Sequence, residues 1–564
     1  MEPVNNFSEA GAFRPDVPIF SLLDQAAQAY PDRQAFIFQN THCTYAALQR
    51  KAEQCAAALR ALGVRNGDRV AVLLPNLPQT IIAFWGIMKA GATAVMINPL
   101  YQEKELVHHF NDCGAKHLIM LDLLWPRISS LRDRLPIGKY IVTTIGDSLS
   151  FPLNLLYAFK SLRQHPSHPV PAHDENVIPW KQFIKTGQRY SARIDHPETQ
   201  PALLQYTGGT TGLPKGVMLT HSNLAANTVQ ILTALQQKAE TEHTFISLLP
   251  FFHVYGLSTG MIIPAALAAT SLPMPRYVPQ DVLHLIRKWK PTIFPGAPSI
   301  YISLLQQKSL QDYDLKSLRL CISGSAPLPR EIFRRFQSIT GATIVEGFGL
   351  TEASPITHIT PLAVSARREG SIGKPLPATE ARLMAEDGSI VTEPGQKGEL
   401  LIRGPQVMRG YWNNDTETAA TLQDGWLRTG DIATVDKDGY YYIIDRKKDM
   451  VLIGGYNVYP REIDEVLLEH PQVLEAVAVG IEDEVRGEII KAYVVPRPGA
   501  DLTRAEITTW CRAKLASYKV PRLVEFRQEL PKTMVGKVLR RALREEERQK
   551  REARAAAKAA AKES

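Results

Sequence analysis

The sequence has few cysteines and none of the spacings that build a metal site or a disulfide framework. Neither C-x-x-C nor H-E-x-x-H occurs in its 564 residues. The five cysteines are an odd number and are widely scattered: Cys43, Cys55, Cys113, Cys321 and Cys511. A zinc site and a set of disulfides are therefore not expected, and the thiols should be buried or reduced, as in a cytosolic protein.

Strong charge of one sign, sequence repeats and a leader pattern are also missing. The net charge is only +8, and acidic residues are interspersed among the basic ones. Nucleic-acid binding usually requires a concentrated basic face, so no nucleic acid partner is expected. The first 18 residues hold no basic stretch followed by an apolar run, which argues against a signal peptide and for a cytoplasmic location.

Apolar runs long enough to cross a bilayer are also scarce. Residues 244–275 contain no Asp, Glu, Lys or Arg, but Pro250, Pro264 and two later prolines interrupt them. Buried strands and loops of a large core, or a lipid-binding cavity, explain such a stretch better. A shorter apolar patch at 151–159 either packs against its own domain or, with the positive charge, supports weak peripheral association with the inner face of the cell membrane.

Strand–turn–helix segments recur from residue 40 to residue 345 and predict an α/β architecture. Apolar runs at 69–75 and 92–98 are typical of strands, and helical spacing follows them at 77–89 and 103–113. Such alternation is typical of parallel sheets layered with helices. A chain of this length should divide into several domains or subdomains.

After about residue 370 the sequence changes to short β-like runs joined by turns, with an Asp438-Gly439 hairpin signal. The charged break Asp445-Arg-Lys-Lys-Asp449 suggests a linker before a compact β/α unit. We predict a large N-terminal domain of layered α/β subdomains plus a β-barrel-like part, followed by a small α+β C-terminal domain. The predicted boundaries are 1–446, 447–543 and a charged, disordered or fraying helical tail at 544–564.

The most informative stretch is a glycine- and threonine-rich string that follows a short apolar run. Its glycines allow the backbone to approach an anion and to point N–H groups toward it, and its lysine adds a positive charge. It contains no G-K-[ST], so it is not a Walker-type P-loop, and its composition alone fits a phosphate loop and a plain turn equally well. The residues suited to phosphate binding are Thr207, Gly208, Gly209, Thr210, Thr211, Gly212 and Lys215.

The whole string, Tyr206-Thr-Gly-Gly-Thr-Thr-Gly-Leu-Pro-Lys-Gly-Val217, resembles the signature loop of the adenylate-forming superfamily. That superfamily includes acyl-CoA synthetases, adenylation domains of peptide synthetases and beetle luciferases. Further matches follow in order from about Phe20 to Arg541. The resemblance implies ATP-dependent activation of a carboxylate as an acyl-adenylate, Mg²⁺ as the metal and a mobile C-terminal domain. It also makes Thr207 one of two metal-site positions.

Two further motifs match positions around the acyl and adenine sites of the family. In Leu249-Pro-Phe-Phe-His253-Val-Tyr-Gly256, the resemblance places His253 between the acyl site and the CoA tunnel, where it helps to orient the carboxylate. A lone histidine among aromatic residues is otherwise often a core residue. The positions matching the segment that packs along adenine are Gly324, Ser325 and Ala326, and the same pattern also fits a plain strand–turn–helix connection.

Glu346-Gly-Phe-Gly-Leu-Thr-Glu352 resembles the central nucleotide motif of the family. The ring of Phe348, flanked by Gly347 and Gly349, can stack on adenine. Thr351 can donate a hydrogen bond to the α-phosphate. Glu352 can hold Mg²⁺, a hard cation that prefers oxygen ligands.

The C-terminal third supplies the remaining matches. Asp431, in Trp426-Leu-Arg-Thr-Gly-Asp431, matches a carboxylate that accepts hydrogen bonds from the ribose hydroxyls. Arg446 matches the second ribose contact, and Lys448 matches the hinge about which the small domain turns. Lys537, in Pro531-Lys-Thr-Met-Val-Gly-Lys537, matches the catalytic lysine that bridges the acyl carboxylate and the phosphates.

One loop matches the family's thioester-forming state. Residues 454–460 resemble the loop that reaches the active site when CoA reacts, and Gly454, Gly455 and Tyr456 begin it. Glycines allow such a backbone to approach the substrate closely. The resemblance therefore implies that rotation of the small domain removes Lys537 and brings this loop in.

The acid is the least determined part of the prediction. The sequence as a whole resembles bacterial long-chain fatty acid:CoA ligases, and residues 244–275 fit an apolar tail. An aryl-acid:CoA ligase of the cinnamate type is the alternative, since Phe251, Phe252 and Tyr255 could pack on a ring. A stand-alone adenylating enzyme that loads a carrier protein is a second alternative. We expect a fatty acid, ATP and CoA as partners, and the sequence leaves open whether the chain acts as a homodimer.

Overall fold

The computed structural model describes residues 17–157, 170–171, 174–185, 188–207, 214–453, 456–483, 487–533 and 536–563. The chain divides into two compact units that interleave in sequence. Unit 1 comprises Met1–Arg367, Gly373–Glu380 and Ile402–Leu427, and unit 2 comprises Arg368–Ile372, Ala381–Leu401 and Arg428–Ser564. The domain boundary at 446/447 remains a prediction, because this division places residues 428–446 with the second unit.

Unit 1 contains an eight-stranded sheet that is parallel except at one edge. Its apolar runs form the central strands, and the predicted strands at 69–75 and 92–98 are confirmed as β3 and β4. The antiparallel edge is made by β8, β9 and β19. In sheet order the strands are β19 (Gly410–Tyr411), β9 (Lys215–Thr220), β8 (Pro201–Thr207), β4 (Thr93–Met96), β3 (Arg69–Leu73), β5 (His117–Leu121), β6 (Lys139–Thr143) and β7 (Val177–Pro179).

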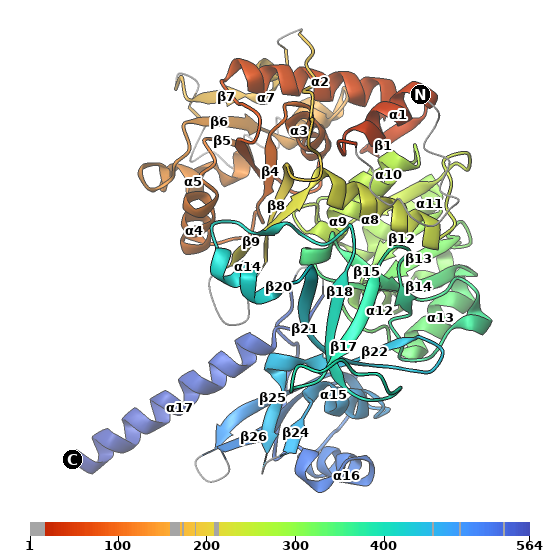
Figure 1. The fold of residues 1–564 in the computed structure, drawn as a ribbon, viewed down its shortest axis with the longest axis vertical. Coiled ribbons are helices and arrows are strands. Elements are labelled where there is room, and N and C mark those ends of the chain that lie inside the picture. The colour runs from red at the N-terminus through yellow and green to blue at the C-terminus, as the bar shows by residue number, and fades with distance from the viewer. Residues whose placement is uncertain are drawn as a thin grey trace. The chain divides into compact units, whose positions relative to one another are not determined.

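A nine-stranded sheet forms the second layer of unit 1 (Figure 1). Strands β10 to β14 run parallel, and β14 turns back into the antiparallel pair β15 and β16. In sheet order the strands are β16 (Lys374–Pro375), β15 (Ile356–Ile359), β14 (Thr343–Gly349), β13 (Leu320–Ser323), β12 (Ile293–Gly296), β10 (Thr244–Ser247), β11 (Thr270–Pro273), β1 (Gln34–Phe38) and β2 (Thr41–Thr44).

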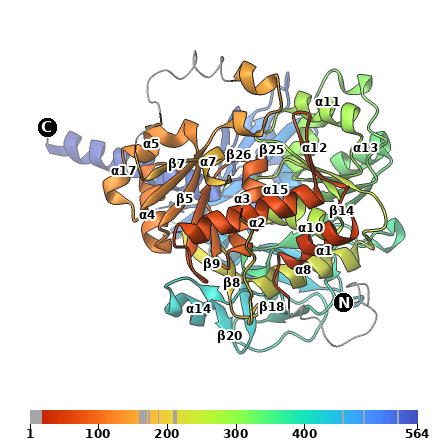
Figure 2. The ribbon, with the colours of Figure 1, turned by 90° about the horizontal axis from the view of Figure 1, so that it is seen from above.

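The helices of unit 1 cover these sheets, and Figure 2 shows α2 running across the unit over α3. Helix α2 starts at Thr44, whose hydroxyl accepts from the Ala47 N–H and caps the first turn. Every residue of α3 is buried, in keeping with the apolar run in its middle, from Ile81 to Met88. The longer helices are α1 (Ser21–Ala29), α2 (Tyr45–Ala61), α3 (Pro78–Lys89), α4 (Glu103–Cys113), α8 (His221–Ala234), α11 (Pro279–Trp289), α12 (Pro298–Leu305) and α13 (Arg330–Thr340).

The uncharged stretch 244–275 is buried in this core, as predicted. It forms β10, α9 (Val254–Leu257), the π-helical turn η4 (Ser258–Ile262), α10 (Ile263–Ala266) and β11. The wider turn of η4 frees the Gly260 carbonyl, which accepts hydrogen bonds from the Ser247 and Ser271 hydroxyls. No helix in the described part of the chain is long and apolar enough to span a bilayer.

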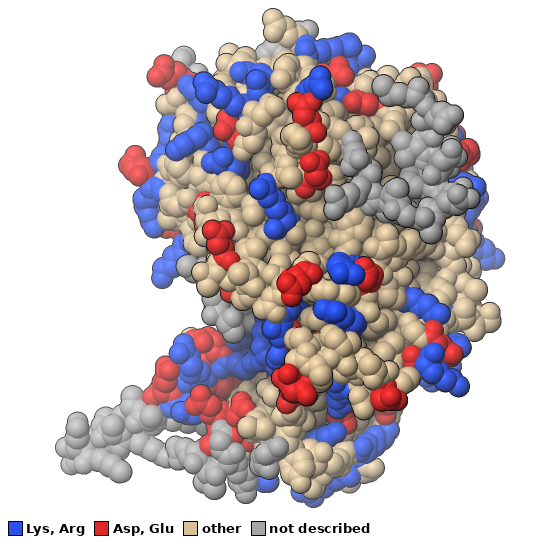
Figure 3. Space-filling view, viewed as in Figure 1, with Lys and Arg blue, Asp and Glu red and all other residues tan. Residues whose placement is uncertain are grey.

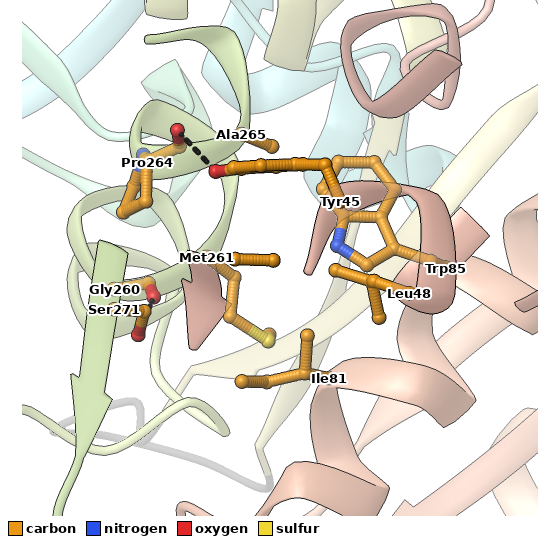
Figure 4. A pocket seen from close by; sticks show the side chains of 10 residues that line it. Tyr45, Leu48, Ile81, Trp85, Gly260, Met261, Pro264, Ala265 and Ser271 are labelled. Carbon is orange, nitrogen blue, oxygen red and sulfur yellow. Dashed lines mark hydrogen bonds between the residues drawn. The ribbon is translucent and has the colours of Figure 1, made fainter. Parts of the chain in front are cut away.

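A small cavity lies where this stretch meets α2 and α3 (Figure 4). Tyr45, Trp85 and Met261 point into it, and the Tyr45 hydroxyl donates to the Pro264 carbonyl at 2.9 Å. Its volume of about 10 Å³ is room for one water molecule, so in this conformation it is a packing gap and too small for an acyl chain.

Unit 2 carries most of a five-stranded sheet and a separate three-stranded sheet. The first lies in the part of the chain for which a barrel-like region was predicted, and has the order β17 (Glu380–Met384), β18 (Gly398–Arg403), β21 (Trp426–Val435) and β20 (Leu422–Gln423), with β22 (Tyr441–Arg446) paired to β21. The second has the order β25 (Val473–Asp483), β26 (Gly487–Pro496) and β27 (Leu523–Phe526).

Among its other described residues, unit 2 has a hairpin and three α-helices. The hairpin pairs β23 (Val451–Ile453) with β24 (Tyr456–Val458). The helices are α15 (Pro460–Leu468), α16 (Arg504–Lys514) and α17 (Arg540–Glu563). The predicted charged tail thus continues a helix, and that helix is anchored at its start by the buried Leu543.

Surface charge and cysteines agree with the sequence. Basic and acidic side chains are interspersed over much of the face shown in Figure 3. All five cysteines are buried free thiols. Burial raises the pKa of Cys113 and Cys511 to about 11, so these thiols are protonated at neutral pH and poorly nucleophilic.

Candidate active site

The phosphate-loop residues that the structure describes lie on two paired antiparallel strands, one on each side of the loop. Thr207 ends β8 and Lys215 begins β9, and the two are paired in register. The Thr207 hydroxyl donates to the Lys215 carbonyl at 3.5 Å. The predicted phosphate contacts between them, Gly208, Gly209, Thr210, Thr211 and Gly212, lie outside the described residues.

Lys215 and Glu352, predicted from motifs far apart in sequence, meet at one tyrosine. The Lys215 ammonium lies 5.2 Å from the ring centre of Tyr411 and is paired with the Glu417 carboxylate. The Tyr411 hydroxyl donates to Glu352 Oε1 at 2.9 Å. Burial, and next the charge of Glu352, raise the pKa of Tyr411, so this hydroxyl stays protonated and remains a donor. One side chain therefore orders both the predicted phosphate lysine and the predicted metal carboxylate.

The segment from Gly347 to Glu352 is shaped by a tight antiparallel turn from β14 into β15. Gly349 is essential there, since a Cβ at this position would lie 1.9 Å from the Pro355 carbonyl oxygen. A Cβ at Gly347 would meet only a side-chain carbon at 3.5 Å. Phe348 is half-buried, and its ring packs edge-on against His358 at 6.0 Å.

Thr351 and Glu352 follow this turn in the short helix η6 (Thr351–Ala353), and both are half-buried. The Glu352 carbonyl accepts from the Met408 N–H at 2.8 Å, which ties the motif to the segment that carries Tyr411. The backbone on both sides of the predicted metal carboxylate is therefore fixed.

His253 caps the short helix α9, and its Nδ1 accepts from the Tyr255 N–H at 3.2 Å. The segment before it is held by the buried side chain of Asn76. That amide donates to the Ser247 and Leu249 carbonyls and accepts from the Phe251 N–H. The half-buried imidazole is thus kept on a fixed backbone, with Nδ1 as the acceptor.

Gly324, Ser325 and Ala326 follow β13, and the last two are half-buried. A Cβ at Gly324 would lie 3.0 Å from the ring of Tyr255, so only glycine fits without displacing that ring. The Tyr255 hydroxyl is committed to the Gly296 and Ile322 carbonyls. Ser325 has a φ of 72°, and this left-handed turn redirects the chain away from the strand. The His253 and Gly324 motifs are therefore packed together through Tyr255, and their assigned roles stay predictions.

Asp431 and Arg446 face each other across β21 and β22 in unit 2. They are paired in register, and Arg446 Nε lies 2.7 Å from Asp431 Oδ1. Burial raises the pKa of Asp431, while the charge of Arg446, and then that of Lys537, oppose the shift. Asp431 Oδ2 is buried and has no hydrogen-bond partner among the residues that the structure describes. A buried oxygen of this kind is a ready acceptor for a ligand hydroxyl.

Lys537 follows Gly536, whose φ is 79°, and its N–H donates to the Thr533 hydroxyl at 3.1 Å. The residue as a whole is exposed, but its ammonium lies within the fields of Asp431, Arg446 and Arg540. Loss of hydration, and next the positive charge of Arg446, lower the pKa of Lys537 to about 8, against the opposing effect of Asp431.

The predicted linker 445–449 is buried at its two ends and exposed in its middle. Lys447 and Lys448 are exposed, and the positive charge of Lys448 acts on Asp431. Asp445 and Asp449 are buried. The segment is therefore anchored by its acidic ends, and the hinge role of Lys448 stays a prediction.

Arg540 pairs with those acidic ends. No role for Arg540 was predicted from the sequence. It pairs with Asp464 of α15, and its Nη1 lies 3.9 Å from both Asp445 and Asp449. Arg544 pairs with Asp449 as well. We call these residues the hinge cluster. It joins β22, η8 (Lys447–Asp449), α15 and α17, and its members are Asp445, Asp449, Asp464, Arg540 and Arg544.

Of the predicted CoA-side loop, 454–460, the structure describes residues 456–460, which begin with β24. Tyr456 begins β24, is exposed, and stacks on Tyr518 with ring centres 4.5 Å apart. Gly454 and Gly455 lie outside the described residues. Their predicted role remains untested.

The candidate metal positions fit Mg²⁺ shared with a substrate. No group of three or more His, Cys, Asp or Glu side chains able to hold a metal occurs in the part of the chain that the structure describes. Mg²⁺ usually takes one or two carboxylates, several waters and the oxygens of substrate phosphates. The oxygen donors of Glu352 and Thr207 suit this mode, because they belong to the two segments that Tyr411 and Lys215 connect.

Comparisons with known proteins identify the family. A model of AMP-binding enzymes matches residues 23–412, and a model of the C-terminal domain of AMP-binding enzymes matches residues 462–537. The chain belongs to the AMP-binding enzyme family. The large and small α/β parts predicted from the sequence are those of this family's fold, as the solved structures also indicate.

This AMP-binding enzyme is similar over nearly its whole length to named relatives. It is 43% identical to a long-chain-fatty-acid–CoA ligase of Bacillus subtilis, over 94% of this chain and 95% of the relative. It is 38% identical to a long-chain-fatty-acid–CoA ligase of Escherichia coli O157:H7, over 93% and 94%. The crystal structure of an anthranilate CoA ligase in complex with anthranoyl-AMP is 31% identical, with a TM-score of 0.82 over 95% of this chain and 98% of that one.

Tyr411, Glu417 and Asn76 are further candidate functional residues that the sequence reasoning missed. Tyr411 lies in a strand of two residues, too short to show a pattern. Asn76 is one buried amide beside a proline. The only signal for Glu417 was an Asn414 cap three residues before it, which marks a helix start but not a partner for Lys215.

Proposed function

We propose that this chain joins a long-chain fatty acid to coenzyme A through an acyl-AMP intermediate and releases pyrophosphate and AMP. The observation that carries the proposal is the 43% identity to a long-chain-fatty-acid–CoA ligase over 94% of the chain. The enzyme is an AMP-forming acyl-CoA ligase, with ATP and CoA as substrates. The retained chemistry of the predicted site residues supports it.

The first half-reaction activates the carboxylate. A carboxylate oxygen attacks the α-phosphorus of ATP, the bond to the β-phosphate oxygen breaks, and pyrophosphate leaves. Charge builds on the phosphate oxygens, and fixed donors stabilise it. We assign Lys215, Thr351 and Lys537 to this task, and loss of one such donor costs about 3 kcal/mol of barrier.

We assign the nucleotide contacts to the predicted site residues. Asp431 Oδ2 supplies a buried acceptor for a ribose hydroxyl, and Arg446 fixes that carboxylate through its other oxygen. We assign the ring of Phe348 to stacking on adenine, and the backbone at Gly324, Ser325 and Ala326 to packing along it. Glu352 and Thr207 would hold Mg²⁺, which supplies charge neutralisation on the phosphates when bound.

The second half-reaction transfers the acyl group. The thiol sulfur of CoA attacks the acyl carbonyl, the bond to the AMP oxygen breaks, and the thiol proton passes to solvent. AMP leaves with the oxygen that came from the carboxylate. We assign His253 to orientation of the carboxylate and the loop 454–460 to the CoA side, with Lys448 as the hinge.

A pyrophosphate-release screen tests the proposal. Fatty acids of increasing chain length and a set of cinnamates are compared, each with and without CoA. The proposal requires the highest kcat/KM for long-chain acids and product thioester only when CoA is present. An aryl-acid:CoA ligase is the second candidate, favoured by the similarity to an anthranilate CoA ligase, and would give the highest kcat/KM for an aryl acid.

We also propose weak peripheral contact with a membrane through the apolar patch. Phe151, Leu155 and Leu156 are 77%, 50% and 61% exposed, which is unusual for such side chains. Co-sedimentation with anionic vesicles should fall when salt is raised and when the three residues are changed to serine. Equal pelleting under all these conditions would remove this part of the proposal.

A further inference from the structure

One edge of helix α4 contacts both sides of the phosphate loop, next to the end of β8 and next to the start of β9. His108 Nε2 lies 3.2 Å from the carbonyl oxygen of Pro214, the residue before Lys215. Asp112 accepts a hydrogen bond through Oδ2 from the hydroxyl of Tyr206, the residue before Thr207. Residues four apart on a helix stand on the same face, so one helical edge reaches both strands where they approach the loop.

The His108 contact bears directly on the backbone of Lys215. The Pro214 carbonyl belongs to the peptide plane that joins Pro214 to Lys215, so a donor on that oxygen limits rotation of the plane. Because a carbonyl can only accept, Nε2 of His108 must carry the hydrogen. Rotation of this peptide would change the direction in which Lys215 leaves the strand.

The Asp112–Tyr206 contact is covered by a neighbouring ring, and Asp112 is also held by a second hydrogen bond. The Tyr206 ring packs edge-on against the buried ring of His109, with centroids 4.5 Å apart. Burial raises the pKa of Tyr206, which keeps its hydroxyl protonated as the donor. The Asp112 carbonyl also accepts from Trp412 Nε1 at 3.0 Å, one residue beyond Tyr411.

The polar edge is separate from the face that packs α4 into the core. Leu106, Phe110 and Cys113 belong to the apolar cluster beneath the sheet. His108 and Asp112 are only half-buried and do not belong to that cluster. A helix that only filled space would need the apolar face alone.

We propose that His108 and Asp112 are positioning residues for ATP. They hold strands β8 and β9 where the strands meet the phosphate loop, so that Thr207 and Lys215 stay in register for the phosphates. This rests on the proposed function only in assigning the hairpin to ATP. Neither residue is given a contact with the substrate.

The test compares two variants of His108 with a matched histidine. His108→Phe keeps an aromatic ring and removes the donor, whereas His108→Gln keeps an N–H at a similar reach. His117→Phe is the control, because His117 Nε2 makes the same kind of bond to the Leu62 carbonyl, at 3.3 Å, away from the hairpin. Melting temperature, equilibrium binding of ATP without acid, and KM and kcat for palmitate-dependent pyrophosphate release are measured on each full-length variant.

The expected result is that His108→Phe weakens ATP binding and raises the KM for ATP about fivefold, the effect of one lost hydrogen bond. The KM for palmitate should not change, His108→Gln should restore ATP binding to within about twofold, and His117→Phe should leave it unchanged. Asp112→Asn and Tyr206→Phe should each weaken ATP binding, and the double variant should be no weaker than the worse single one.

Unchanged ATP binding in His108→Phe would overturn the proposal. So would a Gln variant no better than the Phe variant, or an equal loss in the His117 control. If the wild-type enzyme binds ATP but releases no pyrophosphate with any fatty acid, the proposed function fails, and the binding measurements still decide the role of His108 and Asp112.

Discussion

At the scale of single residues, Lys537 separates the two half-reactions. Lys537→Ala should abolish acyl-AMP formation from palmitate and ATP, because it removes the cation assigned to the phosphates and carboxylate. It should spare thioester formation from synthetic palmitoyl-AMP and CoA. Lys532→Ala, which breaks a surface-side pair with Glu475 on the same segment, is the control and should spare both. Equal loss of both half-reactions in Lys537→Ala would contradict the assigned role.

The pH dependence of adenylation follows from the lowered pKa of Lys537. The protonated form is present below about pH 8 and is lost as the pH rises through that value. The kcat/KM for adenylation, which reports groups of the free enzyme, should therefore fall above about pH 8. Lys537→Arg, whose charge persists, should show no such fall in whatever activity remains. An unchanged alkaline limb in the Arg variant would assign the titration to another group.

Tyr411 gives a prediction that depends on the structure alone. Tyr411→Phe keeps the ring under Lys215 but removes the donor to Glu352, and should lower kcat/KM for ATP about tenfold. Tyr442→Phe removes a similar bond to Asp436, at 3.0 Å, and is the matched control. Activity losses of equal size in the two variants would remove the special role of Tyr411.

These residues also show what the sequence could and could not predict at this scale. Lys537, Asp431 and Glu352 were predicted because each sits in a motif whose neighbours identify it. Tyr411 and Glu417 were not, because their partners lie 59 and 202 residues away and no local pattern encodes such a pair. Partner identity is a property of the folded chain.

At the scale of elements, the turn from β14 into β15 predicts different costs for two neighbouring glycines. Gly349→Ala would drive a methyl group to 1.9 Å from the Pro355 carbonyl oxygen and should abolish activity and lower stability. Gly347→Ala meets only a side-chain carbon at 3.5 Å and should leave the melting temperature nearly unchanged. Thermal unfolding and pyrophosphate release of both variants check this. A stable, active Gly349→Ala would mean that the turn is not as described.

The central elements were predictable, and the edges were not. Continuous apolar runs predicted β3 and β4, and helical spacing predicted α4. The two-residue strands β16 and β19 carry no period, and their pairing is set by β15 and β9. The π-helical turn η4 is likewise invisible in sequence, since the Ser247 and Ser271 hydroxyls that support it come from separate strands.

At the scale of the whole molecule, the hinge cluster should control the stability of unit 2. Arg540→Leu would leave the buried carboxylate of Asp445 and the half-buried carboxylate of Asp464 without their shared cation and should lower the free energy of unfolding of unit 2 by about 3 kcal/mol. Arg551→Ala breaks an exposed pair with Glu482 and should cost less than about 1 kcal/mol. Urea unfolding of the full chain measures both. Similar losses would show that the cluster is no more than a surface network.

The sequence predicted a large α/β domain followed by a small α+β domain. In the structure, the segments of the two compact units alternate along the chain. The change of texture near residue 370 marks where segments begin to alternate between units, and the charged break at 445–449 suggested an exposed linker. The structure buries Asp445 and Asp449 instead, because Arg540 and Arg544 of a distant helix neutralise them. Charge predicts exposure only when no partner is supplied from elsewhere in the chain.

The most direct test of the central claim follows one oxygen atom. Palmitate labelled with ¹⁸O in its carboxylate is incubated with the enzyme, ATP and CoA, and the AMP and pyrophosphate are examined by mass spectrometry. If the acid is activated as an acyl-adenylate, AMP carries one ¹⁸O and pyrophosphate carries none. Label in pyrophosphate or inorganic phosphate, or formation of palmitoyl-CoA with unlabelled AMP, would contradict the account.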